Sequence, residues 1–299
     1  MSDLNLFATV LTYAAPSSNY RGESEENRTV IQKIARAGHE HAVISPESMR
    51  NALREMLAAK GLPMNRTRLH DEEQLAVKYE SFPDARKYAD DFLFGFLVAD
   101  KNAQKKNKDK PARRDSVLRM NLAVALTPYR FDATFHQSPL SAGENPPFKN
   151  TKNSTLLHRE VSWTAYQYPF ALALGDCREA AASKWTRVLL ECIGELSNVA
   201  GGHARSYYEM APRSLVLRLT RSLVCGFDTY GFNEEGGFAE LSRINDGDLP
   251  GKEMWLGGEL VRNLSEAERK RLKEAGAHLY ENPQQLLVKV ADVAELGKA

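Results

Sequence analysis

The sequence predicts an α+β fold in which a ferredoxin-like sheet carries helices on one face. Apolar, strand-like segments and amphipathic helical segments follow one another in the order strand, helix, strand, strand, helix, strand. The 299 residues include 42% hydrophobic and 26% charged residues, a composition typical of soluble proteins with a substantial core. The other face of the sheet is expected to be open, which is how such sheets commonly present themselves to RNA.

The chain starts with a predicted central strand. Residues 4–13 are apolar on both alternating faces, as expected of a strand that is covered on both sides. The Pro, Ser, Asn and Gly residues of the following AAPSSNYRGESEEN predict a loop with Arg21 and Gly22 at its tip. An acidic helix start is expected after this loop.

The next segment, GHEHAVISPESMRNALREML, predicts a short strand at 41–44 and a helix at 45–60. Ser45 provides a capping oxygen, and Pro46 occupies the first helical position. The buried stripe consists of Met49, Ala52, Leu53, Met56 and Leu57, and another side carries Glu47, Arg50, Asn51 and Arg54. These residues alone allow two interpretations: a solvated face on which Glu47 pairs with Arg50, or a face that binds phosphates.

The middle of the chain predicts a peripheral insertion and a basic loop. Residues 61–91 are polar with short helical patterns, and the apolar FLFGFLVA at 92–99 predicts a buried strand, with a helix as the alternative. Residues 101–119 hold eight Lys or Arg and two Asp, a local charge of +6, and predict a mobile loop. A strand is expected at 119–127, where a face that includes Ala123 and Ala125 is small enough to leave room for a ligand.

The second half begins with a long segment, residues 128–159, whose prolines and glycine and lack of periodicity predict a functional or disordered loop. Strand sequence then resumes, and a helix is predicted at 180–200, followed by a half-exposed strand at 212–224. Residues 228–248 hold six acids and one arginine, a local charge of −5. Two charged helices are predicted from Ser265 onward.

Several classes of function lack their sequence signatures. The net charge is +1, so any nucleic-acid site has to be local. The three cysteines suit neither a disulfide framework nor a CxxC metal site, and no P-loop, dinucleotide-binding or zinc hydrolase motif occurs. His39 and His41 have no partner acid nearby, which favours a structural role. We expect a cytoplasmic protein without metal, cofactor, membrane segment or enzymatic activity.

The sequence does contain several separate basic or glycine-rich segments. They are Arg21-Gly22, the Arg50 and Arg54 helix face, the lysine run, Lys149 with Lys152, and GGHAR at 201–205. Phosphate binding needs backbone amides that approach closely, which glycine permits, together with cationic side chains that neutralise charge. Each segment alone is a weak signal, whereas together they favour contacts with a nucleic-acid backbone.

The order of these motifs resembles the DevR-like backbone subunits of type I CRISPR Cascade complexes, which belong to the repeat-associated RNA-binding superfamily. The resemblance rests on the first strand with NYRGESEENRTVIQKI, on HAVISPESMRNALREML, on DDFLFGFLVA and on the later GGHARS loop. Together these motifs extend over most of residues 4–225.

The resemblance implies a modified ferredoxin-like (RRM-like) palm with a helical finger insertion and a protruding thumb loop or hairpin. The implied parts are a first half of the palm at 1–60, fingers at 61–91, palm strands at 92–128 with the basic loop 101–119, a thumb at 129–160, a second half of the palm at 161–227, and an acidic segment with C-terminal helices at 228–299.

The resemblance also implies a non-catalytic ribonucleoprotein subunit of antiviral defence. Copies would stack head to tail in a helical filament along a guide RNA, beside other Cascade subunits, and receive complementary target DNA. The implied RNA-binding residues are Arg21, Gly22, Ser45, Arg50, Asn51, Arg54, Gly201, Gly202, His203 and Arg205. The basic loop and the thumb add Lys105, Lys106, Lys108, Arg113, Arg114, Arg119, Lys149 and Lys152 as nucleic-acid contacts.

Two alternatives remain open. A ribonuclease of the same superfamily, which processes the guide or cuts a target RNA, would use His39, His41 or His203 as a general base. A DNA-binding regulator would need a helix-turn-helix pattern, which the sequence lacks.

Overall fold

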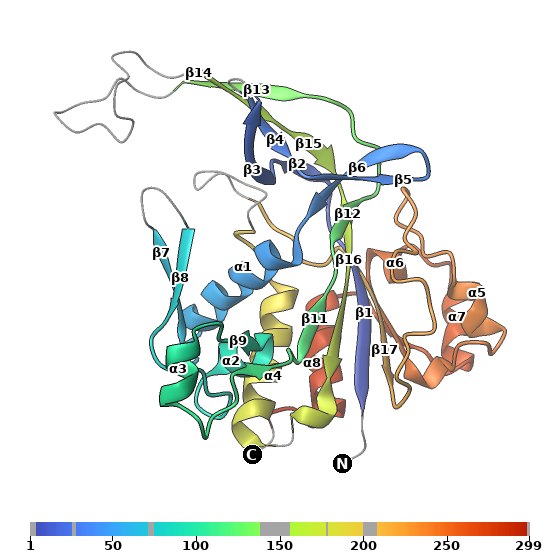
Figure 1. Cartoon of the computed structure of the whole chain (residues 1–299). Helices are drawn as coiled ribbons and strands as arrows, with labels where there is room; N and C mark the ends of the chain where they lie inside the picture. Colours follow the sequence, from blue (N-terminus) through green and yellow to red (C-terminus); the bar gives the residue numbers. More distant parts are fainter. Residues whose placement is uncertain are drawn as a thin grey trace.

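The computed structural model describes residues 4–25, 28–70, 75–137, 156–177, 179–199 and 208–297, and it has the expected α+β fold (Figure 1). The strands are β1 (Asn5–Leu11), β2 (Ala15–Ser17), β3 (Tyr20–Glu25), β4 (Arg28–Ile31), β5 (Lys33–Arg36), β6 (His39–Ile44), β7 (Arg66–His70), β8 (Leu75–Tyr79), β9 (Phe96–Leu97), β10 (Arg113–Arg114), β11 (Leu118–Met120), β12 (Ala123–Ala125), β13 (Ala133–Gln137), β14 (Leu156–Glu160), β15 (Ser162–Thr164), β16 (Tyr166–Ala173), β17 (Ser214–Thr220), β18 (Met254–Gly258) and β19 (His278–Tyr280). The α-helices are α1 (Pro46–Ala59), α2 (Ala89–Phe94), α3 (Lys101–Lys106), α4 (Ala180–Gly194), α5 (Leu241–Asn245), α6 (Glu259–Arg262), α7 (Glu266–Glu274) and α8 (Pro283–Val293).

The main sheet is built around β1, the predicted central strand. Its strands lie in the order β19-β18-β17-β1-β16-β12-β6-β5, and β11 pairs with β16 beside β12. Both neighbours of β1 are antiparallel to it, with Ala8 opposite Phe170 on β16 and Leu217 on β17. The strands predicted at 4–13, 41–44 and 212–224 are therefore confirmed, whereas the two at the β18–β19 edge were not predicted.

One face of the sheet packs against α1, α4 and α8, which confirms the helix-covered face (Figure 1). Alternate residues of β1 enter this core, and Leu6, Ala8 and Val10 are fully buried there. Helix α4 ends at Gly194, earlier than the predicted 200, and packs its apolar stripe against α8. Because the sheet and three helices share one core, the face of α1 that points away from that core is held in a fixed orientation.

The opposite face of the sheet is covered over β1, β17 and β18, so the expectation of an open face is wrong for this part, whereas Pro169 and Ala171 of β16 stay half-buried on it. A second apolar cluster joins the sheet residues Leu11, Val216 and Leu256 to Phe232, Phe238 and Ile244 of the acidic segment and to its neighbours Phe227 and Leu249. The Thr9 hydroxyl also donates to the carbonyl of Thr229 at 2.7 Å. The segment 228–248 thus combines an acidic exterior with buried aromatic residues that close this face.

Two strand predictions are wrong in detail for the same reason. Strand β17, expected to be half-exposed, is buried along its whole length because β18 and residues 225–249 cover its polar side, where Arg218 pairs with Glu253 at 2.8 Å. The segment 119–127 is split into β11 and β12, and Ala123 and Ala125 point into the helix-side core rather than to a ligand.

Within the apolar run at 92–99, residues 92–94 form the end of helix α2 and residues 96–97 form the short strand β9, so the helical alternative is correct only for the first part of the run. Burial on all sides gives the same apolar pattern for a short helix and a strand, and the sequence cannot separate them. The chain leaves α2 at Gly95, whose φ of 66° and ψ of 177° are a conformation that is nearly exclusive to glycine. The short strand β9 follows and pairs with β10.

Three other segments also differ from their predictions. Within 61–91 the structure has the hairpin β7–β8 where helix was expected, and α2 begins at Ala89. Where a loop and then an acidic helix start were expected, the structure has the strands β2, β3, β4 and β5. Arg21 and Gly22 lie within β3. The basic run 101–119 is ordered into α3, β10 and the start of β11.

The implied thumb region, 129–160, contains the antiparallel pair β13–β14, which extends a small sheet of order β13-β14-β4-β3. The intervening residues 138–155 lie outside the described ranges. No helix within the described part of the chain is long and apolar enough to cross a membrane.

Glu160, at the end of β14, fixes this small sheet to the rest of the protein. Its buried carboxylate accepts hydrogen bonds from Lys33 Nζ at 2.8 Å, from the backbone amide of Ile31 at 2.9 Å and from the Tyr129 hydroxyl. Burial alone would raise the pKa of Glu160, but the bonds from Lys33 and Tyr129 outweigh it and lower that pKa below the ordinary value. The charged carboxylate therefore stabilises the fold.

We expect Glu160→Gln to lower the free energy of unfolding at pH 7 by about 1–3 kcal/mol, because the amide cannot replace the charged acceptor of Lys33. A lowered folded pKa gives stability that is present above pH ~4.3 and is lost as the pH falls through the folded pKa. Urea unfolding at pH 7, 5 and 3 should therefore show a stability difference between the two proteins that shrinks toward pH 3. A difference that stays constant over this range would contradict this role of the charge.

Candidate nucleic-acid interface

Helix α1 begins as its sequence predicts. The Ser45 hydroxyl accepts a hydrogen bond from the backbone amide of Ser48 at 3.2 Å, and Pro46 is the first helical residue. Four residues of the predicted stripe, Met49, Ala52, Leu53 and Leu57, are buried in the core. This packing turns Arg50, Asn51 and Arg54 toward α2 and the β7–β8 hairpin.

Arg50 is not paired with Glu47 on a solvated face, so that interpretation is wrong. Its guanidinium donates to the backbone carbonyl of Phe94 at the end of α2 and lies 3.4 Å from the Ser116 hydroxyl. The guanidinium carbon also lies 5.6 Å from the centre of the Phe94 ring. These contacts fix Arg50 without neutralising its charge.

Arg54 lies one turn further along α1 and packs on the same ring, with its guanidinium carbon 4.4 Å from the ring centre of Phe94. Its Nη1 donates to the Asn51 side-chain oxygen at 3.0 Å, whereas its buried Nε has no hydrogen-bond partner among the described residues. Burial, together with the positive charges of Arg66 and Arg50, lowers the pKa of Arg54 to about 10. The side chain is still protonated at neutral pH.

A cleft of about 280 Å³ separates α1 from β7, and it is lined by two arginines, Arg54 and Arg66, one acid, Glu55, and the polar Asn51 and Thr67. Figure 1 shows the β7–β8 hairpin standing beside α1. Arg66 is exposed and lies 5.9 Å from the ring of Tyr79 on β8. Within the described ranges, none of Arg50, Arg54 and Arg66 forms an ion pair with a carboxylate.

Arg66 was missed by the sequence prediction, which expected helix in this region. The alternation RTR places arginine at a spacing of two, which is a strand pattern and would have indicated a basic strand face. The hairpin base is held by the buried Asn65, whose backbone amide donates to Asp90 at 2.9 Å and whose side-chain amide donates to Asp91 at 2.8 Å. The start of α2 thereby positions Arg66 against α1.

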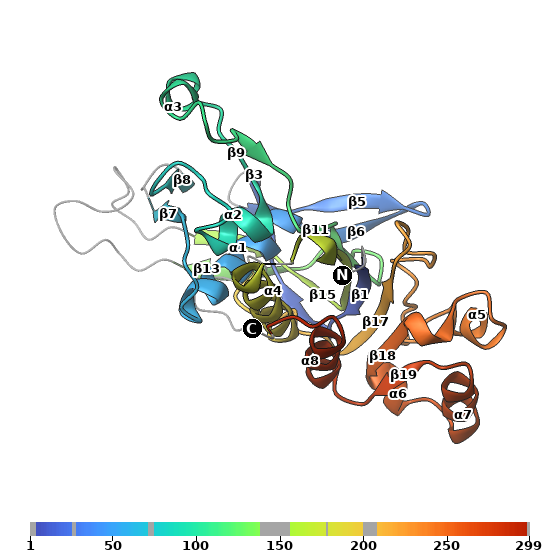
Figure 2. The same ribbon diagram turned by 90° about the horizontal axis from the view of Figure 1, so that it is seen from below.

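The predicted basic residues of 101–119, except Arg119 on β11 of the main sheet, lie on a separate arm formed by β9, α3 and β10, which projects from the body in Figure 2. Of these, Lys105, Lys106, Lys108, Arg113 and Arg119 are exposed, on α3, after it, on β10 and on β11. Arg114 is partly buried and donates to the backbone carbonyl of Phe92 at 2.7 Å. The arm is a second basic surface beside the α1 cleft.

Several predicted site residues cannot be located. Arg21 and Gly22 have a described backbone in β3, but the Arg21 side chain lies outside the described part. Gly201, Gly202, His203, Arg205, Lys149 and Lys152 lie outside the described ranges altogether. The structure thus brings Arg50, Asn51 and Arg54 together with the new Arg66.

The described histidines give no support for catalysis. The Nδ1 of the buried His41 lies 2.9 Å from the carbonyl oxygen of Ala125, a structural contact between β6 and β12, while His39 is exposed. No group of three His, Cys, Asp or Glu side chains in the described ranges could hold a metal ion.

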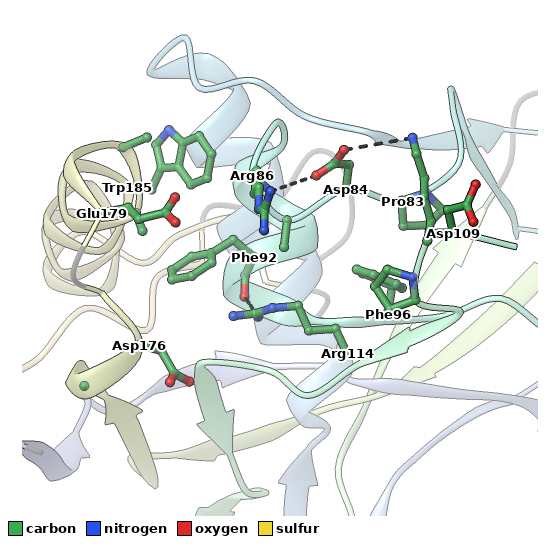
Figure 3. A pocket seen from close by; sticks show the side chains of 16 residues that line it. Pro83, Asp84, Arg86, Phe92, Phe96, Asp109, Arg114, Asp176, Glu179 and Trp185 are labelled. Atoms are coloured by element: carbon green, nitrogen blue, oxygen red, sulfur yellow. Dashed lines mark hydrogen bonds and ion pairs between the residues drawn. The ribbon is translucent and has the colours of Figure 1, made fainter. Parts of the chain in front are cut away.

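A larger cavity of about 540 Å³ lies between α2, the arm and the start of α4 (Figure 3). Its walls include Phe92, Phe96 and Trp185 together with both acidic and basic side chains, among which Asp84 and Lys110 pair at 3.9 Å. It contains no histidine, cysteine or serine. Acidic side chains outnumber basic ones in this cavity, whereas arginines outnumber the one acid in the α1 cleft, so the candidate interface is the α1 cleft.

A comparison with curated proteins finds a relative that matches almost the whole chain. The CRISPR-associated protein Cas7/Cst2/DevR of Myxococcus xanthus (strain DK1622) is 34% identical over 288 residues, which cover 92% of this chain and 93% of the relative. The chain belongs to the Cas7/Cst2/DevR family of CRISPR-associated proteins. The match covers 92% of this chain and therefore includes part of the segment 228–299. The family likeness thus extends beyond the motifs at 4–225.

Solved structures share the Cas7/Cst2/DevR fold of this chain. A chain of a CRISPR RNA-guided surveillance complex, pre-nicking, superposes with a TM-score of 0.64 and covers 97% of this chain and 100% of its own length at 11% identity. A chain of another CRISPR RNA-guided surveillance complex gives a TM-score of 0.56, with 97% and 99% covered, also at 11% identity. A scan of protein-family models finds no match.

Proposed function

We propose that this Cas7/Cst2/DevR protein is a non-catalytic, guide RNA-binding backbone subunit of a type I CRISPR surveillance complex. The observation that carries the proposal is the cluster of Arg50, Arg54 and Arg66 at the α1 cleft, three cations that form no ion pair with a carboxylate within the described ranges. Partly buried arginines without a carboxylate partner favour binding of an anion, and the guanidinium matches the geometry of a phosphate. The family assignment and the fold shared with chains of RNA-guided complexes make that anion a guide RNA phosphate.

Contacts of this kind carry no sequence information, because phosphates are the same at every nucleotide. Specificity for the target would then come from base pairing between guide and target, while the protein holds the guide backbone. A subunit of this type can serve any guide sequence, and it can receive complementary target DNA on the exposed bases.

The proposal extends to residues beyond the cleft. The basic arm, with Lys105, Lys106, Lys108, Arg113 and Arg114, would contact nucleic acid further along the backbone, as would Arg119 on β11. The proposal gives the same role to Arg21, Gly22, Ser45, Asn51, Gly201, Gly202, His203, Arg205, Lys149 and Lys152. Palm, fingers and thumb would correspond to the main sheet with its helices, to the β7–β8 region and to the β13–β14 region.

Copies of the subunit would stack head to tail along the guide and contact other Cascade subunits. The acidic exterior of 228–248 suits a contact with protein better than one with RNA, because Asp228, Glu234, Glu235 and Asp246 are exposed. A heterologous contact of this kind repeats along a filament without closing into a ring.

The competing function within the superfamily is RNA cleavage, and incubation of the purified protein with repeat RNA and with target RNA separates the two. We expect retention of intact RNA and no cleavage over hours. Cleavage that disappears in His39→Ala, His41→Ala or His203→Ala would overturn the non-catalytic assignment, because it would identify a general base.

A further inference from the structure

We propose that Phe94 is a positioning residue of the RNA interface, which holds Arg50 and Arg54 in the orientation that binds a backbone phosphate. The inference rests on the proposed function and adds to it a residue that does not itself contact RNA. Phe94 is buried at the end of α2 and cannot reach a ligand.

Two different groups of Phe94 hold the arginines. Its carbonyl, at the C-terminus of α2, accepts a hydrogen bond from Arg50, and its ring lies beneath Arg54 at 4.4 Å and beside Arg50 at 5.6 Å. A cation over an aromatic face is attracted by the ring quadrupole, and the attraction increases when water is excluded. The ring attracts both cations without supplying the negative charge that would compete with a phosphate.

Holding the arginines matters because a free arginine side chain has many rotamers, which binding would have to restrict. Arg54 is fixed on one side by the Phe94 ring and on another by Asn51, so its loss of rotamer freedom occurs during folding and not on binding. The same helix provides a matched pair of contacts outside the cleft: Phe92 accepts Arg114 Nη1 at its carbonyl, and its ring lies 4.7 Å from that guanidinium (Figure 3).

The test is a double-mutant cycle on full-length protein with a short, fluorescently labelled single-stranded RNA. Phe94→Leu keeps an apolar side chain but removes the aromatic face, and we expect it to weaken RNA binding about three- to tenfold. In an Arg54→Ala background the same substitution should weaken binding less than twofold, because the side chain that it positions is gone. Phe92→Leu should change RNA affinity by the same factor in both backgrounds.

Three outcomes are distinguishable. An equal loss from Phe94→Leu in both backgrounds would show that Phe94 acts through general packing and would overturn the inference, as would no loss in the wild-type background. If Arg54→Ala itself leaves RNA binding unchanged, the proposed function of the cleft fails instead. Thermal unfolding of Phe94→Leu and Phe92→Leu, both at buried positions of α2, shows whether each variant is folded at the assay temperature.

Discussion

Replacing both Arg50 and Arg54 by alanine is expected to weaken binding of single-stranded RNA by roughly 100-fold near 0.1 M salt. Each charged hydrogen bond to a phosphate contributes about 1.5–3 kcal/mol, and 1.4 kcal/mol corresponds to a factor of ten. The slope of log K against log salt should fall by about 0.7 for each arginine, because fewer counterions are released. The loss should be the same for all RNA sequences, since phosphates are read and not bases.

Two further variants make this measurement specific. Arg271→Ala with Lys273→Ala also removes two positive charges, but from exposed positions on α7, at the end of the molecule far from the arm in Figure 2. We expect that variant to bind RNA within about twofold of the wild type, because distant exposed charges are screened. Equal losses in the two double variants would mean that net charge, and not the α1 cleft, determines binding. Losses that depend on RNA sequence would argue against backbone recognition.

Gly95→Ala is expected to destabilise the protein by about 2–6 kcal/mol. The backbone conformation at this position costs a residue with a side chain about 1–3 kcal/mol, and overpacking adds about 1–3 kcal/mol. The added carbon would lie 2.5 Å from the Arg114 carbonyl oxygen and 2.8 Å from the Ser116 amide nitrogen, so the backbone of 114–116 has to move. Urea unfolding measures the change, and RNA affinity should fall as well because Ser116 neighbours Arg50.

Gly38→Ala is the matched control for this substitution. Gly38, at the tip of the β5–β6 hairpin, also has a positive φ, of 81°, but a carbon added there meets nothing within 4 Å. It therefore carries the conformational cost without the clash. If both substitutions lower the free energy of unfolding equally, the close approach of β10 does not add to the cost of a side chain at position 95.

The elements that could be predicted are those whose signals are local in the sequence. Helix α1 starts where Ser45 and Pro46 indicate, and its buried stripe follows from the spacing of Met49 and Leu53 alone. The central strand β1 was predicted because it is buried on both faces, so its run of apolar residues needs no knowledge of its neighbours.

The parts that could not be predicted depend on contacts between distant residues. Arg50 and Arg54 look solvated in the sequence, and their environment is decided by Phe94, which lies 44 positions after Arg50. The acidic composition of 228–248 concealed Phe232 and Phe238, whose burial against the sheet closes the face that was expected to be open. Helix α2 is too short for its period to be distinguished from that of a strand.

The most direct test of the central claim is the mass of the complexes that the purified protein forms with single-stranded RNAs of increasing length. A backbone subunit should add copies in whole-number steps as the RNA lengthens, with the same number of copies on RNAs of equal length and unrelated sequence. Light scattering or native mass spectrometry gives that number directly. A single copy on every RNA, or a copy number that depends on sequence and not on length, would contradict the assignment as a guide RNA backbone subunit.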